Sequence, residues 1–429
     1  MRELLRRGQA YLCFATKDEL TDISARQQSA KLPTGYYGDW AIWRDADPAT
    51  VVAKLAEGTP YVVRFRAPAL SAGARARFVD AIRGPLEHEA NRNDAVILKS
   101  SDQPVRLPTY HFAHAVDDHL MRITTVVRGE EWISSVPLHQ QLFTALGHPP
   151  VTYAHIAPLM KTISGGKRKL SKRKDPEAGV DFYIQAGYPA AAVLYYLRGL
   201  ANGRLAELPL HEALAAPIRL DQCGVAGPLV DLVKLEDISA DHIATLPGER
   251  VLDAVSAWAT MYDPQLADVL GTHHDLALRA LAVERGEGVT NPRKDLRKWS
   301  DFRSAYGFFF PRLVHPRSPD QPTTVSPPHP PVAADIVSAL GLDLAENYQH
   351  LDNPTEWFDQ VRALAAKHGF APSPKDYKRD PTAYPGSIRE ASQLVRLALT
   401  GSTRSPDMHA VATALGAEET ANRLRTLTV

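Results

Sequence analysis

The most charged segment of the sequence is Lys161-Thr-Ile-Ser-Gly-Gly-Lys-Arg-Lys-Leu-Ser-Lys-Arg-Lys174, which carries seven basic residues and no acidic one. Gly165 and Gly166 predict a loop, because glycine adopts backbone shapes that other residues resist. Leu170 would anchor this loop to a core, and the hydroxyl of Ser171 lies between pairs of basic residues. Lysines arranged in this way could neutralise the phosphates of a nucleotide, although a solvated basic turn is the alternative.

The overall composition indicates which kinds of partner and which cellular location to expect. The 49 basic and 49 acidic residues give a formal net charge of +0, so a nucleic acid would have to be attracted by local clusters. The two cysteines, Cys13 and Cys223, offer at most one disulfide, and we expect a reducing, cytoplasmic location. No run approaches the roughly 18 apolar residues of a membrane span, so we expect no membrane partner.

The elements that must position the chemical groups alternate between strands and helices in the first part of the chain. Strands are predicted at 61–66, 94–99 and 122–127, and a helix at 137–146, which is typical of α/β units. The first residues indicate the end of an amphipathic helix, closed by Gly8.

The second part of the chain is predicted to be mostly helical. Helices are expected at 181–202, 251–261 and 408–427. The proline-rich stretch 311–331 predicts a linker or an extended surface loop, followed by a compact helical unit.

Several motifs in this sequence resemble those of one enzyme family. Lys169-Leu-Ser-Lys-Arg173 resembles the KMSKS signature of class I aminoacyl-tRNA synthetases, in the form used by glutamate–tRNA ligases. The other matching segments are Gly35–Trp40, Leu107–Leu120, Val127–Trp132, Asn291–Trp299, Leu399–Gly401 and Pro406–Met408. They occur in the order found in the family, and together the resemblance covers essentially the whole chain.

The resemblance implies a fold of class α/β plus all-α. We expect an acceptor-binding insertion of α+β type at 1–113 and the second half of a Rossmann-type catalytic domain at 114–181. A helical stem-contact region at 182–285 and an all-α anticodon-binding domain at 286–429 should follow. The cofactors implied are ATP and Mg²⁺, and the implied substrates are L-glutamate and tRNA-Glu.

The resemblance also assigns roles to residues. Lys169, Ser171 and Lys172 would be catalytic, and ATP would contact Glu131, Trp132, Lys169, Lys172 and Arg173. Glutamate would bind Tyr110, His114 and Arg128, and tRNA would bind Lys294, Arg297, Lys298 and Arg396. Lysine suits the phosphate sites as a flexible point charge, whereas a guanidinium can pair a carboxylate through two hydrogen bonds.

Each assignment has a structural alternative. Arg128 could form a salt bridge with Glu130 or Glu131, and Tyr110, at a predicted strand end, and Trp132 could be packing residues. Lys294, Arg297 and Lys298 could belong to an amphipathic helix, and Arg396 could be a helix-surface residue.

Histidine and aspartate at helical spacing could in principle hold a metal. The residues concerned are His111, His114, Asp117, Asp118 and His119. We expect a structural role for them, because the resemblance implies no zinc here. Cys13 keeps one thiol of a Cys-x-Cys pair that binds zinc in some relatives, so no metal site is expected there either.

A second signature of the family, a His-x-Gly-His turn that meets the phosphates of ATP, is not found in the sequence. Gly271-Thr-His-His274 has the wrong order, and Ala154-His-Ile-Ala157 lacks the glycine and the second histidine. We therefore expect an incomplete nucleotide-binding fold, which would activate glutamate poorly unless a separate polypeptide supplies the N-terminal half. A non-catalytic tRNA-binding paralogue, or one that ligates glutamate to another acceptor, is the alternative.

Overall fold

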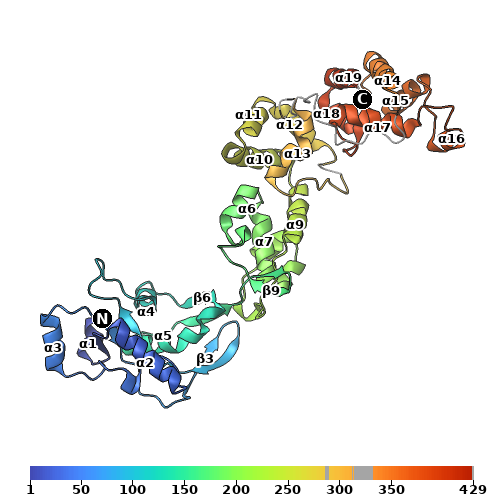
Figure 1. Ribbon diagram of the computed structural model, residues 1–429. Helices are drawn as coiled ribbons and strands as arrows, with labels where there is room; N and C mark the ends of the chain where they lie inside the picture. Colours follow the sequence, from blue (N-terminus) through green and yellow to red (C-terminus); the bar gives the residue numbers. More distant parts are fainter. Residues whose placement is uncertain (286–288, 312, 314–331, 428–429) are drawn as a thin grey trace. The chain divides into compact units, whose positions relative to one another are not determined.

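The computed structural model describes residues 1–285, 289–311, 313 and 332–427. The chain divides into two compact units. Unit 1 comprises Met1–Leu170, Arg198–Leu208 and Ala215–Val230, and unit 2 comprises Ser171–Leu197, Pro209–Leu214 and Asp231–Val429. In Figure 1, the colours from blue to green-cyan follow unit 1 up to residue 170.

Unit 1 mixes short helices with strands, as the alternating pattern predicts. Its helices are α1 (Arg2–Arg6), α2 (Lys17–Ser29), η1 (Gly38–Trp40), α3 (Pro48–Ala56), α4 (Tyr110–Leu120), η2 (Glu130–Ser135), α5 (Val136–Leu146), η4 (Gly203–Glu207) and η5 (Leu220–Gln222). Its strands are β1 (Ala10–Cys13), β2 (Val62–Phe65), β3 (Arg75–Asp80), β4 (Gly84–Glu89), β5 (Val96–Leu98), β6 (Thr125–Gly129), β7 (Thr152–Ile156), β8 (Met160–Ile163) and β9 (Gly166–Lys169).

The strands of unit 1 form three sheets. The order is β1-β2-β5 in an antiparallel sheet, β4-β3-β7-β6 in a mixed sheet, and β8-β9 in a hairpin. β7 runs parallel to both β3 and β6, as expected for an α/β unit. The predictions at 61–66 and 94–99 are confirmed by β2 and β5, but the strand predicted at 122–127 begins only at Thr125, because Arg122 adopts a φ of 58°.

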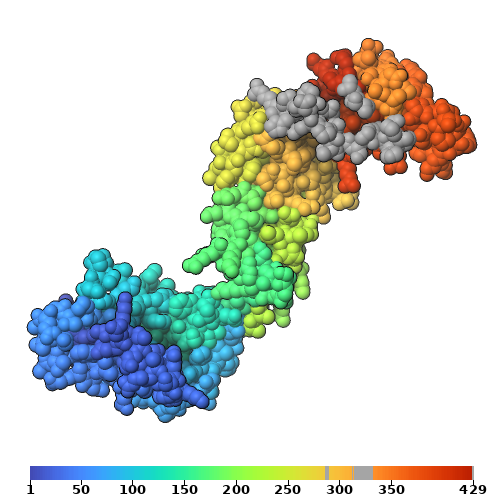
Figure 2. Space-filling view, in the orientation of Figure 1, coloured from blue at the N-terminus to red at the C-terminus, as the bar shows by residue number. Residues whose placement is uncertain are grey.

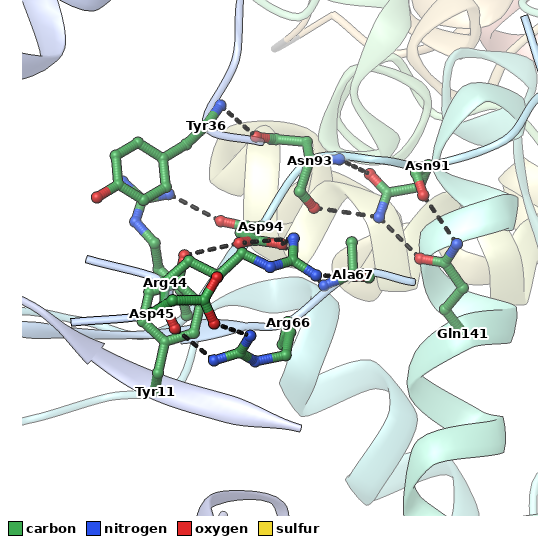
Figure 3. Close-up of polar contacts among 11 residues, drawn as sticks. Tyr11, Tyr36, Arg44, Asp45, Arg66, Ala67, Asn91, Asn93, Asp94 and Gln141 are labelled. Carbon is green, nitrogen blue, oxygen red and sulfur yellow. Dashed lines mark hydrogen bonds and ion pairs between the residues drawn. The ribbon is translucent and has the colours of Figure 1, made fainter. Parts of the chain in front are cut away.

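A buried carboxylate organises the polar interior of the first hundred residues (Figure 3). Asp94 accepts hydrogen bonds from the Tyr11 hydroxyl at 2.7 Å and from Arg44 at 3.0 Å. Asn91 and Gln141 exchange a further pair of bonds, each 2.8 Å long, and so connect this region to α5. The region predicted as an insertion is therefore bonded directly to the helix that follows it.

Unit 2 is helical. It contains η3 (Pro176–Ala178), α6 (Val180–Ala186), α9 (Leu232–Ala244), α10 (Gly248–Tyr262), α11 (Pro264–Thr272), α12 (His274–Ala282), η6 (Trp299–Asp301), α13 (Phe302–Tyr306), η7 (Gly307–Phe309), α14 (Ala334–Asn347), α15 (Pro354–Lys367), α16 (Pro374–Arg379), α17 (Ile388–Thr400), α18 (Met408–Leu415) and α19 (Ala417–Arg425). Two more helices, α7 (Ala190–Ala201) and α8 (Leu210–Ala215), run across a boundary between the units.

Two helix predictions need correction. The helix predicted at 181–202 is two helices, because Gly187 adopts a φ of +83° and ends α6. A Cβ at this position would lie 3.1 Å from Ser300 and from Trp258, so glycine also permits the close approach of these residues. The helix predicted at 408–427 is likewise split into α18 and α19. The helix at 251–261 is confirmed by α10, and the helix at 137–146 by α5.

The helices of unit 2 share one large apolar core. It extends from Ile243 to Leu427 and includes the buried rings of Phe302, Tyr306 and Trp357. The orange and red helices α14, α15, α17, α18 and α19 form a compact bundle (Figures 1 and 2), which confirms the predicted helical unit. Most of the predicted linker at 311–331 lies outside the described residues. Among the residues described, no helix is both long and apolar enough to cross a bilayer.

Candidate active site around Arg128

Strand pairing places the first functional side chains. β6 and β7 are parallel neighbours in which Arg128 is the partner of His155, so both side chains leave the same face of the sheet. Nε of Arg128 donates to Nε2 of His155 at 3.0 Å. Nδ1 of His155 lies 2.6 Å from a carboxylate oxygen of Asp80, the last residue of β3. Both side chains of this last pair are fully buried.

The surroundings of this pair keep the carboxylate charged and the imidazole neutral. Burial alone would raise the pKa of Asp80, but hydrogen bonds from the His155 ring and from backbone N–H groups lower it overall. Burial lowers the pKa of His155, although the hydrogen bond to Asp80 acts in the opposite direction. The pair is therefore an aspartate that accepts a hydrogen bond from a neutral histidine.

A second imidazole contacts Arg128 from α5. Nδ1 of His139 lies 3.3 Å from both terminal nitrogens of the guanidinium, and its Nε2 lies 2.9 Å from Nδ1 of His111. Burial lowers the pKa of His139 to about 2, with help from the charges of His114 and Arg128. A histidine with so low a pKa is uncharged throughout the physiological range.

Aromatic rings form the rim of this site. Tyr110 is 47% exposed, and its ring lies 4.5 Å from that of Trp132 between centroids. Tyr110 is the first residue of α4, so the prediction of a strand end is wrong there. His114, one turn later on α4, pairs with Asp118 at 2.8 Å and with the Tyr153 hydroxyl at 2.9 Å. Tyr110, His114 and Arg128, predicted separately for glutamate, thus lie in one cluster.

The salt bridge of Arg128 with Glu130 or Glu131, the structural alternative to a role in binding, does not form. Glu130 pairs with Arg83, and Glu131 pairs with Lys169 at 2.8 Å. Within the described ranges, Arg128 has no carboxylate partner. Its remaining contacts are a hydrogen bond to the carbonyl of Trp132 at 3.3 Å and a longer one, 3.5 Å, to the Tyr110 hydroxyl.

The basic segment is built differently from the predicted loop. Its first half is the β8-β9 hairpin, in which Gly165 with a φ of +98° and Gly166 with a φ of +146° make the turn. Leu170 follows the hairpin and donates its N–H to the carbonyl of Leu159 at 2.8 Å, which attaches the segment to unit 1. Lys169 and Glu131 are both about half exposed, at 56% and 50% of their side-chain areas.

The boundary between the two units falls inside the KMSKS-like motif, after Leu170. In unit 2, the N–H of Ser171 donates to a carboxylate oxygen of Asp175 at 2.9 Å. Lys172 and Arg173 are exposed, and neither forms an ion pair with any residue that the structure describes. Two cations of the motif are thus uncommitted.

The residues predicted for tRNA carry existing partners. Lys294 pairs with Asp241 at 2.7 Å, and Arg297 and Lys298 both pair with Glu236. These three residues precede η6 and lie in no helix, so the alternative of an amphipathic helix is wrong.

Arg396 lies on α17 and is partly buried. It donates to the carbonyl and the hydroxyl of Ser405 at 3.1 Å each. Arg396 is therefore more than a helix-surface residue, because it connects α17 to the loop before α18.

No group of three histidine, cysteine or acidic side chains among the described residues could hold a metal ion. A cavity of about 630 Å³ lies elsewhere, beside the contacts of Figure 3, and its walls include Arg44, Arg66 and Gln141. None of the residues predicted for glutamate or ATP lines this cavity. The candidate site is therefore the open cluster around Arg128 and not this cavity.

Sequence reasoning missed Asp80, His139 and His155, which complete the cluster. The strand Thr152–Ile156 did carry a signal, since Tyr153 and His155 alternate on one buried face. For Asp80 and His139 no local pattern indicates a role, because they reach the cluster only through sheet pairing and helix packing.

Comparisons with known proteins identify the family and the class of fold. Residues 1–215 match the family described as tRNA synthetases class I (E and Q), catalytic domain, and residues 387–428 match an anticodon binding domain. These matches confirm the predicted class of fold, α/β plus all-α.

Similar proteins cover most of the chain. A glutamate–tRNA ligase of Acetivibrio thermocellus is 37% identical over 99% of this chain and 76% of its own length. One of Sorangium cellulosum is 37% identical over 96% of this chain and 73% of its own length. The solved glutamate–tRNA ligase of Elizabethkingia meningosepticum, in complex with its amino acid, has the same fold, with a TM-score of 0.71 at 23% identity. The match covers 100% of this chain and 81% of the solved chain. The chain therefore belongs to the glutamate–tRNA ligase family of class I aminoacyl-tRNA synthetases.

Proposed function

We propose that this protein joins L-glutamate to ATP as glutamyl-adenylate and then transfers the glutamyl group to the 3′-terminal ribose of tRNA-Glu in the cytoplasm. The observation that carries the proposal is Arg128, a half-buried guanidinium with no carboxylate partner among the described residues, beside the exposed ring of Tyr110. Such a group can pair the side-chain carboxylate of glutamate through two hydrogen bonds. We assign glutamate binding to Tyr110, His114 and Arg128.

We assign ATP to the segment around the KMSKS-like motif. Lys169, Ser171 and Lys172 would stabilise the triphosphate while the glutamate carboxylate attacks the α-phosphorus, and Glu131, Trp132 and Arg173 would lie beside the nucleotide. The exposed, unpaired ammonium of Lys172 suits phosphate oxygens. Mg²⁺, which commonly enters such sites with the substrate phosphates, would be held mainly by ATP.

For tRNA we propose Lys294, Arg297, Lys298 and Arg396. The three residues before η6 form ion pairs whose members are largely exposed or partly exposed. The pair of Lys294 and Asp241 is the most exposed, and an exposed pair contributes only about 0–1 kcal/mol, so a phosphate could replace Asp241 at little cost. The four predicted segments, 1–113, 114–181, 182–285 and 286–429, keep their proposed roles at the acceptor end, the catalytic centre, the stem and the anticodon.

We further propose that activation depends on a His-x-Gly-His segment, which residues 1–429 do not contain and which a separate polypeptide could supply. β6 is an end strand of the mixed sheet, and its outer edge has no partner strand among the described residues. An open edge next to a parallel pair can accept another strand. A strand added there would bring its loops to the carboxyl ends of β6 and β7, where Arg128 lies.

The test is ATP–pyrophosphate exchange with glutamate, measured for the chain alone and after addition of a polypeptide that carries the missing turn. Exchange that appears only after the addition supports the proposal. Tight tRNA binding that weakens steeply between about 50 and 200 mM salt, with no exchange under any condition, would indicate a tRNA-binding paralogue instead.

A further inference from the structure

The partners of Arg128 have one property in common, which is that none of them is an anion. Within the described part of the chain, its hydrogen bonds go to ring nitrogens of His155 and His139, the hydroxyl of Tyr110 and the carbonyl of Trp132. The guanidinium also lies 4.7 Å from the centroid of the Tyr153 ring. Arg128 is thus held in place while its positive charge stays unneutralised.

Hydrogen-bond chemistry determines which nitrogen of His155 carries the proton. A guanidinium only donates, so Nε2 of His155 is the acceptor of the bond from Arg128. The ring hydrogen must then be on Nδ1, which donates to Asp80. Asp80 also accepts from the backbone N–H groups of Ile82 and Arg83 at 3.0 Å, and these bonds favour its ionised form. An ionised carboxylate cannot donate, so Asp80 fixes this tautomer of His155.

The same argument applies to the imidazole on the other side. Nδ1 of His139 accepts from Arg128, so the ring hydrogen is on Nε2 and donates to His111. The side chain of His139 is fully buried, and burial opposes the second proton that would make it a cation. Two neutral acceptors therefore fix the direction of the guanidinium from β7 and from α5.

We propose that Asp80, His155 and His139 are positioning residues that determine substrate specificity. They aim Arg128 without neutralising it, so that the site selects the carboxylate of glutamate over the isosteric, neutral amide of glutamine. This inference rests on the proposed function, in which Arg128 binds the glutamate side chain.

The physical reason is the difference between neutral and charged acceptors. A carboxylate in place of His139 would hold Arg128 equally well but would compete with the substrate carboxylate for the same charge. A protonated imidazole would repel the guanidinium and could not accept its hydrogen bond. Only a neutral acceptor both orients the guanidinium and leaves its charge to the substrate.

The experiment compares His139→Asn with His139→Asp, which differ in one atom and one charge. The side-chain oxygen of asparagine can replace Nδ1 as a neutral acceptor, whereas aspartate supplies an anion. Affinities for glutamate and for glutamine are measured by calorimetry on the full chain. We expect His139→Asn to keep the preference for glutamate within about threefold, and His139→Asp to reduce it by roughly 10-fold or more, because an anion beside the guanidinium repels the substrate carboxylate.

A second variant, Asp80→Asn, tests the tautomer directly. The asparagine amide can donate to Nδ1 of His155, which would move the ring hydrogen to Nε2. That hydrogen would then point at the N–H of Arg128, and Nε2 could no longer accept a hydrogen bond from it. ¹⁵N chemical shifts of the histidine rings report this change in the full chain. Asp94→Asn is the matched control, because Asp94 is an equally buried carboxylate in unit 1 that contacts Arg44 and Tyr11 and not Arg128.

The outcomes separate this inference from the proposed function. If the wild-type chain binds neither amino acid, the proposed function and the specificity role fail together, and the ring spectra then decide the positioning role alone. A second outcome is that the wild-type chain prefers glutamate while His139→Asp and His139→Asn show the same preference for glutamate over glutamine as each other. In that case the specificity role is overturned and the proposed function stands. Protonation of wild-type His155 on Nε2 would overturn the positioning role, even if every variant failed to fold.

Discussion

Arg128 and Arg285 are two sheltered guanidinium groups that the protein holds in opposite ways. Arg285, in unit 2, is 3% exposed in its side chain and pairs with Asp295 at 2.8 Å. Arg128, in unit 1, is held by two neutral imidazoles and has no carboxylate partner among the described residues. A neutralised guanidinium stabilises the fold around it, whereas an unneutralised one is available to an external anion. The type of partner, more than burial, separates a structural arginine from a binding one.

The largest effect should come from breaking the neutralised arginine. Arg285→Met leaves the carboxylate of Asp295 with Arg293 and the Tyr306 hydroxyl, and the loss of one partner from a buried pair costs about 3–5 kcal/mol. We expect the free energy of unfolding of unit 2, measured by urea denaturation, to decrease by an amount near the lower end of this range. Adding Asp295→Leu should restore part of this lost free energy, because no carboxylate is then left with a missing partner. A double variant whose loss in free energy equals the sum of the losses in the two single variants would contradict this account.

Breaking the other arginine should affect binding and not stability. Arg128→Gln removes a charge but leaves no carboxylate unpaired, so the free energy of unfolding should change by only about 1 kcal/mol. Glutamate binding should weaken by about 2–3 kcal/mol, because a charge-assisted pair is lost. Calorimetric titration with glutamate measures this effect. Equal loss of stability in Arg128→Gln and Arg285→Met would remove the distinction between the two arginines.

The imidazoles around Arg128 should make the fold sensitive to acid. The pKa of His139 is about 2, far below its ordinary value of 6.5, and the pKa values of His111, His114 and His155 are lowered as well. The unfolded chain therefore binds more protons than the folded chain below pH 6.5. Stability should be complete above this pH and should fall on acidification by up to about 1.4 kcal/mol per pH unit for each histidine.

Unfolding free energies between about pH 7.5 and pH 5.5 test this slope, in a range that lies above the ordinary pKa values of aspartate and glutamate. His139→Asn lacks one of the four groups and should show a flatter dependence on pH. An identical slope in this variant and in the wild-type chain would show that His139 is not the source of the acid sensitivity.

The smallest effect should come from the exposed pair of Lys169 and Glu131. The hydrogen bond from Lys169 lowers the pKa of Glu131, but both side chains are about half exposed. Glu131→Gln should therefore change the free energy of unfolding by less than about 1 kcal/mol. Thermal unfolding measures this change, and a loss as large as that of Arg285→Met would show that the pair is a structural element.

Local sequence patterns predicted the elements that depend on nearby residues. The alternation in 61–66 predicts β2, and the apolar spacing of 251–261 predicts α10, because each pattern reflects one face of a single element. The same patterns missed the breaks at Gly187 and Gly416, since a helical period continues across them in sequence. The close packing of Ser300 and Trp258 against Gly187 is a tertiary contact, and no local pattern encodes it.

The sequence by itself determined the family of this protein and the types of side chain in its site, because motifs such as Lys169–Arg173 are contiguous. Only the tertiary structure decided what Arg128 contacts. Glu130 and Glu131 are its neighbours in sequence, yet they pair with Arg83 and Lys169, while His155 reaches it through the register of two parallel strands. Proximity along the chain does not fix which charges meet, since sheet pairing and helix packing bring distant residues closer than adjacent ones.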